Sequence, residues 1–138
     1  MEINWLSVLI AGIAGIVIGA LWFGPKTFFP IWWKYLGRKP SEQPGTANMG
    51  VVFGLTFVGA FAQAIVMAVV IALASSFNTD LGWFGGMATG ALMSIGFNAA
   101  TTLGHKLSGG FDLRTWVLEV GQDTVSLAAM GAIIGAML

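Results

Sequence analysis

Apolar residues are grouped along the chain into four long runs, which are separated by short polar segments. The runs cover about residues 4–24, 49–74, 81–104 and 112–136. A run of about 20 apolar residues forms a helix of about 30 Å, which matches the hydrocarbon thickness of a bilayer. The pattern predicts an all-α fold, an integral membrane four-helix bundle that forms a single membrane domain over residues 1–138.

A segment of different character follows the first run. Residues 25–40 interleave aromatic and cationic side chains, and Pro30 and Pro40 prevent a long regular helix. Trp and Tyr rings settle at the level of the lipid headgroups, where Lys and Arg meet anionic lipid. We therefore predict a short interfacial segment that anchors the chain. A role in capping a cavity or binding a lipid headgroup is the alternative.

The composition agrees with lipid as the main surrounding solvent. Hydrophobic residues make up 57% of the 138 residues and charged residues only 9%, against about a quarter in ordinary soluble domains. Six Lys and Arg balance six Asp and Glu, and six scattered cations cannot build the basic patch that nucleic-acid binding needs. The chain has no Cys and one His, which excludes thiol catalysis and a His-rich metal site within one chain. We expect no metal and no cofactor.

The cations are distributed unequally between the polar segments. They lie between the first and second runs and around the connection between the third and fourth: Lys26, Lys34, Arg38, Lys39, Lys106 and Arg114. The N-terminus, the turn at 75–80 and the C-terminus contain none. The positive-inside rule then predicts cytoplasmic basic loops and two external termini in a bacterial plasma membrane.

Small residues recur every four positions in all four runs. The third run has the longest row: Gly82, Gly86, Gly90, Ser94, Asn98 and Thr102. Such rows let helix backbones approach closely in lipid, where no hydrophobic effect draws helices together. They indicate packing within one bundle, a homo-oligomer seam, or both.

Polar residues within the fourth run carry the most information about chemistry. Glu119, Gln122, Asp123 and Ser126 follow the spacing i, i+3, i+4, i+7, so they share one helix face. At ~1.5 Å per residue from Asp112, Glu119 lies about 10 Å deep and Asp123 about 16 Å deep, near the midplane. An ionisable group at that depth faces other helices or water.

The third run lies antiparallel to the fourth and supplies candidate partners. Counted from a helix end near His105, Asn98 is predicted to lie level with Glu119 and Ser94 level with Asp123. Asp123, Glu119, Gln122, Asn98, His105 and Ser94 are therefore the candidate residues of a ligand or proton site.

Three interpretations of this polar stripe remain open. The side chains fix helix register through interhelical hydrogen bonds; or Asp123 and Glu119 exchange protons in a small transporter or channel; or His105 and a carboxylate perform acid–base catalysis. The enzyme interpretation ranks third because the chain has a single His and no phosphate-binding loop or nucleophile elbow.

The stretch from Gly19 to Trp33 resembles a known family. Its sequence GALWFGPKTFFPIWW is similar to the G-x-x-W-[YF]-x-P motif of the domain-of-unknown-function family 1761, small bacterial membrane proteins with four predicted spans. Trp22, Pro25 and Trp32 are the motif residues, while Phe23 replaces the expected Tyr and Pro30 stands where Gly is usual. The resemblance implies the fold and the membrane location, and no activity.

These observations together favour a non-enzymatic membrane protein. We expect it to assemble as a homo-oligomer through Gly and Ala faces and to bind lipid or a small hydrophobic ligand, with the bilayer as its main partner. A proton-linked transporter or channel that uses Glu119 and Asp123 is the alternative.

Overall fold

The computed structural model describes residues 1–42 and 48–138, and every regular element in them is helical. The elements are α1 (Trp5–Trp22), α2 (Phe29–Tyr35), α3 (Met49–Phe77), α4 (Gly82–Met93), the π-helix η1 (Ser94–Ala99), α5 (Ala100–Ser108) and α6 (Leu113–Ala136). Helices α1, α3 and α6 are each long and apolar enough to cross a membrane. The structure therefore confirms the all-α fold and the membrane-like helices of the first, second and fourth runs.

The third apolar run is helical throughout but divided. It forms α4, η1 and α5, which follow one another without an intervening loop. None of the three is long enough by itself to cross a bilayer.

Local sequence explains where several helices begin and end. Asn4, Asn48 and Asp112 are N-caps whose side-chain oxygens accept hydrogen bonds from backbone N–H groups of the first turns of α1, α3 and α6. Pro30 lies in the first turn of α2, where a missing N–H is tolerated. Gly110, with φ of 79°, reverses the chain between α5 and α6 in a conformation that favours glycine.

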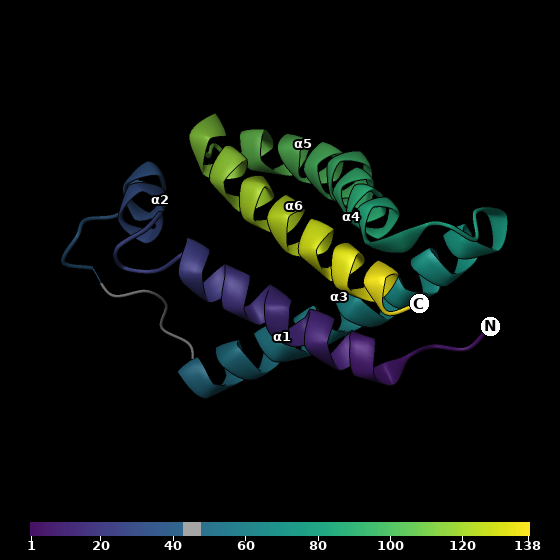
Figure 1. Ribbon diagram of the computed structural model, residues 1–138. Coiled ribbons are helices and arrows are strands. Elements are labelled where there is room, and N and C mark those ends of the chain that lie inside the picture. The colour runs from purple at the N-terminus through teal and green to yellow at the C-terminus, as the bar shows by residue number, and fades with distance from the viewer. Residues whose placement is uncertain (43–47) are drawn as a thin grey trace.

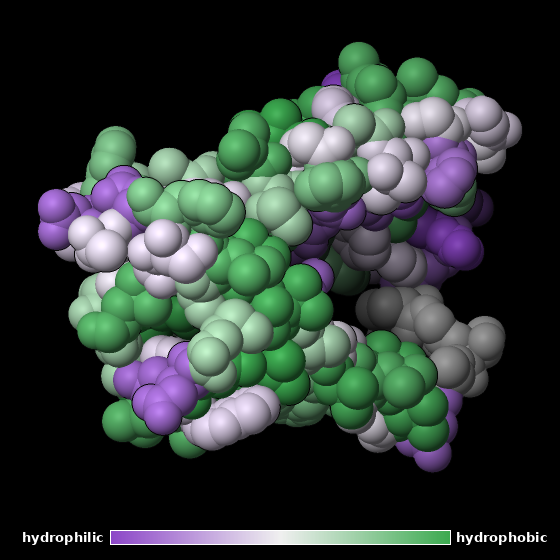
Figure 2. All heavy atoms as spheres, turned by 90° about the vertical axis from the view of Figure 1, so that its right-hand side faces the viewer, coloured by the Kyte–Doolittle hydropathy of each residue, from purple (hydrophilic) through white to green (hydrophobic). Residues whose placement is uncertain are grey.

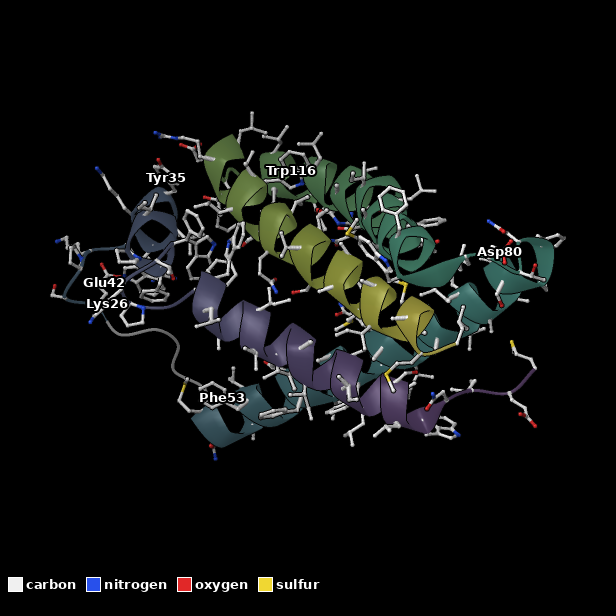
Figure 3. All side chains as sticks on the ribbon, in the orientation of Figure 1. Lys26, Tyr35, Glu42, Phe53, Asp80 and Trp116 are labelled. Atoms are coloured by element: carbon white, nitrogen blue, oxygen red, sulfur yellow. The ribbon has the colours of Figure 1, made fainter. Side chains whose placement is uncertain are left out.

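The helices alternate in direction and divide the molecule into two ends (Figure 1). One end carries α2 and the connection between α5 and α6, and the other carries both termini. Asn4 Nδ2 donates a hydrogen bond to the Met137 carbonyl at 3.1 Å, which joins the two terminal segments. In Figure 3, Lys26 and Tyr35 lie at the first end and Asp80 at the second.

Two different interfaces hold the helices together. Side chains of α1, α3 and α6 form the buried core: Val8, Ala11, Ala64, Met67, Ala68, Ile71, Met130 and Ile134. Helices α4 and α6 instead pack backbone against backbone. A Cβ atom added at Gly86 would lie 2.0 Å from the Gly131 carbonyl oxygen, and one at Gly90 would lie 2.0 Å from the Leu127 carbonyl oxygen. Gly86 and Gly90 of the third run thus form a seam within one chain.

Most of the remaining surface is apolar. Large hydrophobic side chains are exposed on all the long helices; Val58 and Leu55 of α3, for example, are 66% and 67% exposed. Hydrophobic residues also dominate the face in Figure 2, where hydrophilic residues gather around a hollow in its middle. Lipid tails solvate such a surface at no hydrophobic penalty.

Candidate functional site

The polar stripe of α6 starts at a well-defined helix end. Asp112 Oδ1 accepts a hydrogen bond from the Arg114 backbone N–H at 2.8 Å, and the Arg114 guanidinium pairs with Asp112 Oδ2 at 2.7 Å. The side-chain and then the backbone hydrogen bonds from Arg114 lower the pKa of Asp112 to about 2. The N-cap of α6 therefore stays ionised well into the acid range.

Asp123 pairs with the π-helix of the neighbouring run. Asn98 Nδ2 donates a hydrogen bond to Asp123 Oδ2 at 2.6 Å, and Ser94 Oγ lies 2.8 Å from Thr124 Oγ1. Ser94 is fully buried, while Asp123 and Asn98 are partly buried. Both partner residues belong to η1, and π-helical segments are frequent at functional sites.

The contact of Ser94 with Thr124, next to Asp123, agrees with the predicted alignment of the third and fourth runs, but the side chain of Asn98 has a different partner from the predicted one. That residue was predicted to lie level with Glu119, but it bonds to Asp123 instead. The Asn98 side chain, which projects from the π-helical segment Ser94–Ala99, bonds one turn farther along α6 than predicted.

Glu119 lies nearer the basic end and has two partners that the stripe pattern did not reveal. Lys106 Nζ of α5 lies 2.9 Å from the carboxylate, and Trp32 Nε1 of α2 donates to Glu119 Oε1 at 3.2 Å. The Lys106 and Glu119 side chains are 23% and 26% exposed. Glu119 therefore joins three elements, α2, α5 and α6. The Lys106–Glu119 pair could have been predicted from the antiparallel arrangement of the third and fourth runs, which places Lys106 near the same end as Glu119.

The other candidate residues do not all join this cluster. Gln122 Nε2 donates to Ser126 Oγ within α6 at 2.8 Å. His105 is exposed and makes no side-chain hydrogen bond or ion pair with any other described residue. Trp116 was not predicted to take part in the stripe, but its Nε1 donates to Thr102 Oγ1 at 3.1 Å and to the Ala99 carbonyl at 3.2 Å. Figure 3 shows Trp116 beside α5 and α6.

A groove opens beside the Asp123 pair. Its volume is about 330 Å³, and it lies between α3 on one side and Met93 and η1 on the other, with Leu127 of α6 contributing to the wall. The lining is mostly apolar, and its polar side chains are Gln63 and Asn98. Asn98 therefore belongs both to the groove and to the hydrogen bond with Asp123.

No group of three or more His, Asp or Glu side chains that could hold a metal ion occurs within residues 1–42 and 48–138. The chemistry that the described residues offer is that of hydrogen bonds, one interhelical ion pair and an apolar groove.

The comparisons with known proteins identify a family. The family described as "Protein of unknown function (DUF1761)" matches residues 6–135, nearly the whole chain. The chain belongs to the DUF1761 family. No curated protein and no solved structure matches it.

Two of the three DUF1761 motif residues, Trp22 and Trp32, contact α6. Trp22 Nε1 donates to the Leu118 carbonyl at 3.0 Å, and a Cβ atom added at Gly121 would lie 3.0 Å from the Trp22 ring. Trp32 Nε1 donates to the side chain of Glu119, the residue after Leu118. Pro25 is exposed in the turn that separates α1 from α2. In this DUF1761 chain the motif therefore folds the α1–α2 connection back onto the stripe.

Proposed function

We propose that this protein crosses the membrane four times and binds a small hydrophobic ligand in the groove between α3 and η1, without catalysing a reaction. The observation that carries the proposal is the groove itself, an apolar volume of about 330 Å³ with hydrogen-bonding side chains at one wall. Small-molecule sites in proteins are concave, mostly apolar and contain a few polar groups that orient the ligand.

Helices α1, α3 and α6 supply three of the four proposed crossings. The remaining crossing is formed by α4, η1 and α5 together. Their combined run begins at Gly82 beside the end that carries the termini and reaches Ser108 at the basic end. It packs against α6, which is long and apolar enough to span. Because α6 is proposed to span the bilayer and lies alongside this segment, the segment is proposed to cross the bilayer as well.

The orientation follows from the cations. All Lys and Arg residues belong to the segments that meet at the α2 end, so this end faces the cytoplasm of a bacterial cell and both termini face outward. Because the chain has no Cys, single cysteines report the orientation directly. We expect a membrane-impermeant maleimide to label Thr79→Cys in intact cells and to label Ser41→Cys only after permeabilisation. The reverse labelling would contradict the proposed orientation.

Binding in the groove is tested with a neutral aromatic probe, 1-naphthalenemethanol, and the protein in phosphatidylcholine nanodiscs. Ala62 is an exposed residue of α3 that lines the groove. We expect Ala62→Phe to weaken binding about tenfold or more, because the added ring occupies the volume that the ligand needs. Isothermal titration calorimetry, with empty nanodiscs subtracted, measures the effect.

Ala88→Phe is the matched control. Ala88 is also exposed, but it lies on α4 outside the groove, so the same substitution is expected to leave binding unchanged. Equal effects of the two variants would contradict a ligand site in the groove.

Homo-oligomerisation remains part of the proposal. Because Gly86 and Gly90 already face α6 of the same chain, a second copy has to use other small residues. Cβ atoms added at Gly54, Gly59 or Gly104 meet no atom within 4 Å. These glycines are the ones that a second copy would contact.

Proton-linked transport is the second candidate function. It is favoured by the positions of Glu119 and Asp123, which lie one turn apart on α6 and hold partners on the same antiparallel neighbour. Ionisable residues inside a membrane domain are typical of proton and ion pathways.

A further inference from the structure

The two carboxylates of the stripe differ in how their charge is balanced. Glu119 has the cation Lys106 at 2.9 Å. Asp123 takes part in none of the three ion pairs that the described residues form. Its only hydrogen-bond donor among them is the neutral amide of Asn98, which binds Oδ2. Asp123 Oδ1 therefore remains available for a further donor.

No other element around Asp123 supplies a balancing cation. Helices α1, α3, α4 and η1, which surround this part of α6, contain no Asp, Glu, Lys, Arg or His. The cations of the neighbouring segments, Lys106 and Arg114, are paired with Glu119 and Asp112. His105 of α5 is exposed, and Lys34 belongs to α2 beside Trp32 and Trp33. A carboxylate in this setting needs a proton or an external cation as its partner.

The groove is lined by Asn98, which donates a hydrogen bond to the Asp123 carboxylate. Leu127, which lies one turn after Asp123 on the same face of α6, also lines the groove. The ring of Phe97 lies among the apolar lining residues. A ligand that fills the groove thus meets an apolar and aromatic surface, and the Asp123 carboxylate lies behind the amide of Asn98.

We propose that the ligand of the groove is a lipophilic cation, a protonated amine on a hydrophobic body, whose N–H group binds Asp123 while Asn98 keeps its own hydrogen bond to the carboxylate. This assignment rests on the groove as the binding site proposed above and adds the charge of the ligand. An aromatic or branched apolar body packs against α3 and η1, and the face of Phe97 favours a nearby cation.

The test compares two probes that share one carbon skeleton, 1-naphthylmethylamine and 1-naphthalenemethanol. Both are titrated into the protein in phosphatidylcholine nanodiscs at neutral pH, where the amine is protonated and the lipid carries no net charge. We expect the amine to bind at least about tenfold more tightly, as a hydrogen bond to a charged partner predicts. Asp123→Asn should remove this preference and leave the affinity for the alcohol within about twofold.

Asp80→Asn is the matched control, because Asp80 is an exposed carboxylate at the opposite end of the molecule. It should preserve the preference for the amine. Equal affinity of the unmodified protein for both probes would overturn the cation assignment and leave the groove as a site for neutral ligands, and this comparison needs no variant to fold. A preference that survives in Asp123→Asn would also overturn it. Failure of both probes to bind would instead overturn the proposed function.

Discussion

Replacing Gly90 by alanine is expected to destabilise the protein by about 3 kcal/mol or more. The new Cβ atom would lie 2.0 Å from the Leu127 carbonyl oxygen and 2.6 Å from its carbonyl carbon. These are backbone atoms of a helix, so they cannot move aside as a flexible side chain does. The helices must separate along the seam that glycines form on both sides, and overpacking of this kind is destabilising even where side chains can adjust. Unfolding by SDS in mixed micelles, followed by circular dichroism, measures the change in free energy.

Gly96→Ala provides the control on the same helical run. A Cβ atom added at Gly96 meets no atom within 4 Å, so this variant changes helix propensity without changing the α4–α6 seam. We expect Gly96→Ala to be neutral or slightly stabilising, because alanine is the better helix former. Equal stability of the Gly90 and Gly96 variants would show that α4 and α6 do not pack as closely as the structure has them.

The sequence predicted the helices well because hydrophobic length is a direct requirement of the bilayer. The first, second and fourth predicted runs correspond to helices α1, α3 and α6. The third run is also helical without interruption. The shared face of Glu119 and Asp123 was also predictable, since the period of an α-helix fixes it. Such properties depend only on residues close together in the chain.

The partners across helices were harder to predict. Small-residue rows occur in every run, so the rows identify close-packing faces but not which helix each face meets. That Gly90 meets Leu127 depends on the register of two helices. Even where the alignment of two helices is predicted correctly, a side chain can bond one turn away, as Asn98 does with Asp123 and not with Glu119.

The contacts of α2 were the least predictable. Trp32 looks like an interfacial residue in the sequence, and Lys106 like a charge that marks the cytoplasmic side. Their convergence on Glu119 depends on how the chain folds back after α1. This fold-back is tertiary structure, which no periodicity in residues 25–40 encodes.

Lys106→Met is expected to destabilise the protein by about 2 kcal/mol. The Lys106 and Glu119 side chains are each less than one-third exposed. Exposed pairs contribute at most about 1 kcal/mol to stability, and removing one partner of a fully buried pair costs about 3 to 5 kcal/mol. The cost of removing the Lys106 cation should lie between these limits. Methionine keeps the length and the apolar contacts of the lysine stem. The main loss is therefore that the Glu119 carboxylate no longer has a cation.

Two further variants distinguish the effect of the unbalanced Glu119 charge from the effect of losing any ion pair. Glu119→Gln in the Lys106→Met background keeps an oxygen for Trp32 and removes the unbalanced charge, so the double variant should recover about 1 kcal/mol relative to Lys106→Met alone. Glu42→Gln breaks the exposed Arg38–Glu42 pair, whose atoms are 3.5 Å apart, and should change the stability by less than about 0.5 kcal/mol. A Lys106→Met variant as stable as Glu42→Gln would show that the pair does not join α5 to α6. In that case Trp32 would be the remaining hydrogen-bond donor to Glu119 among the described residues.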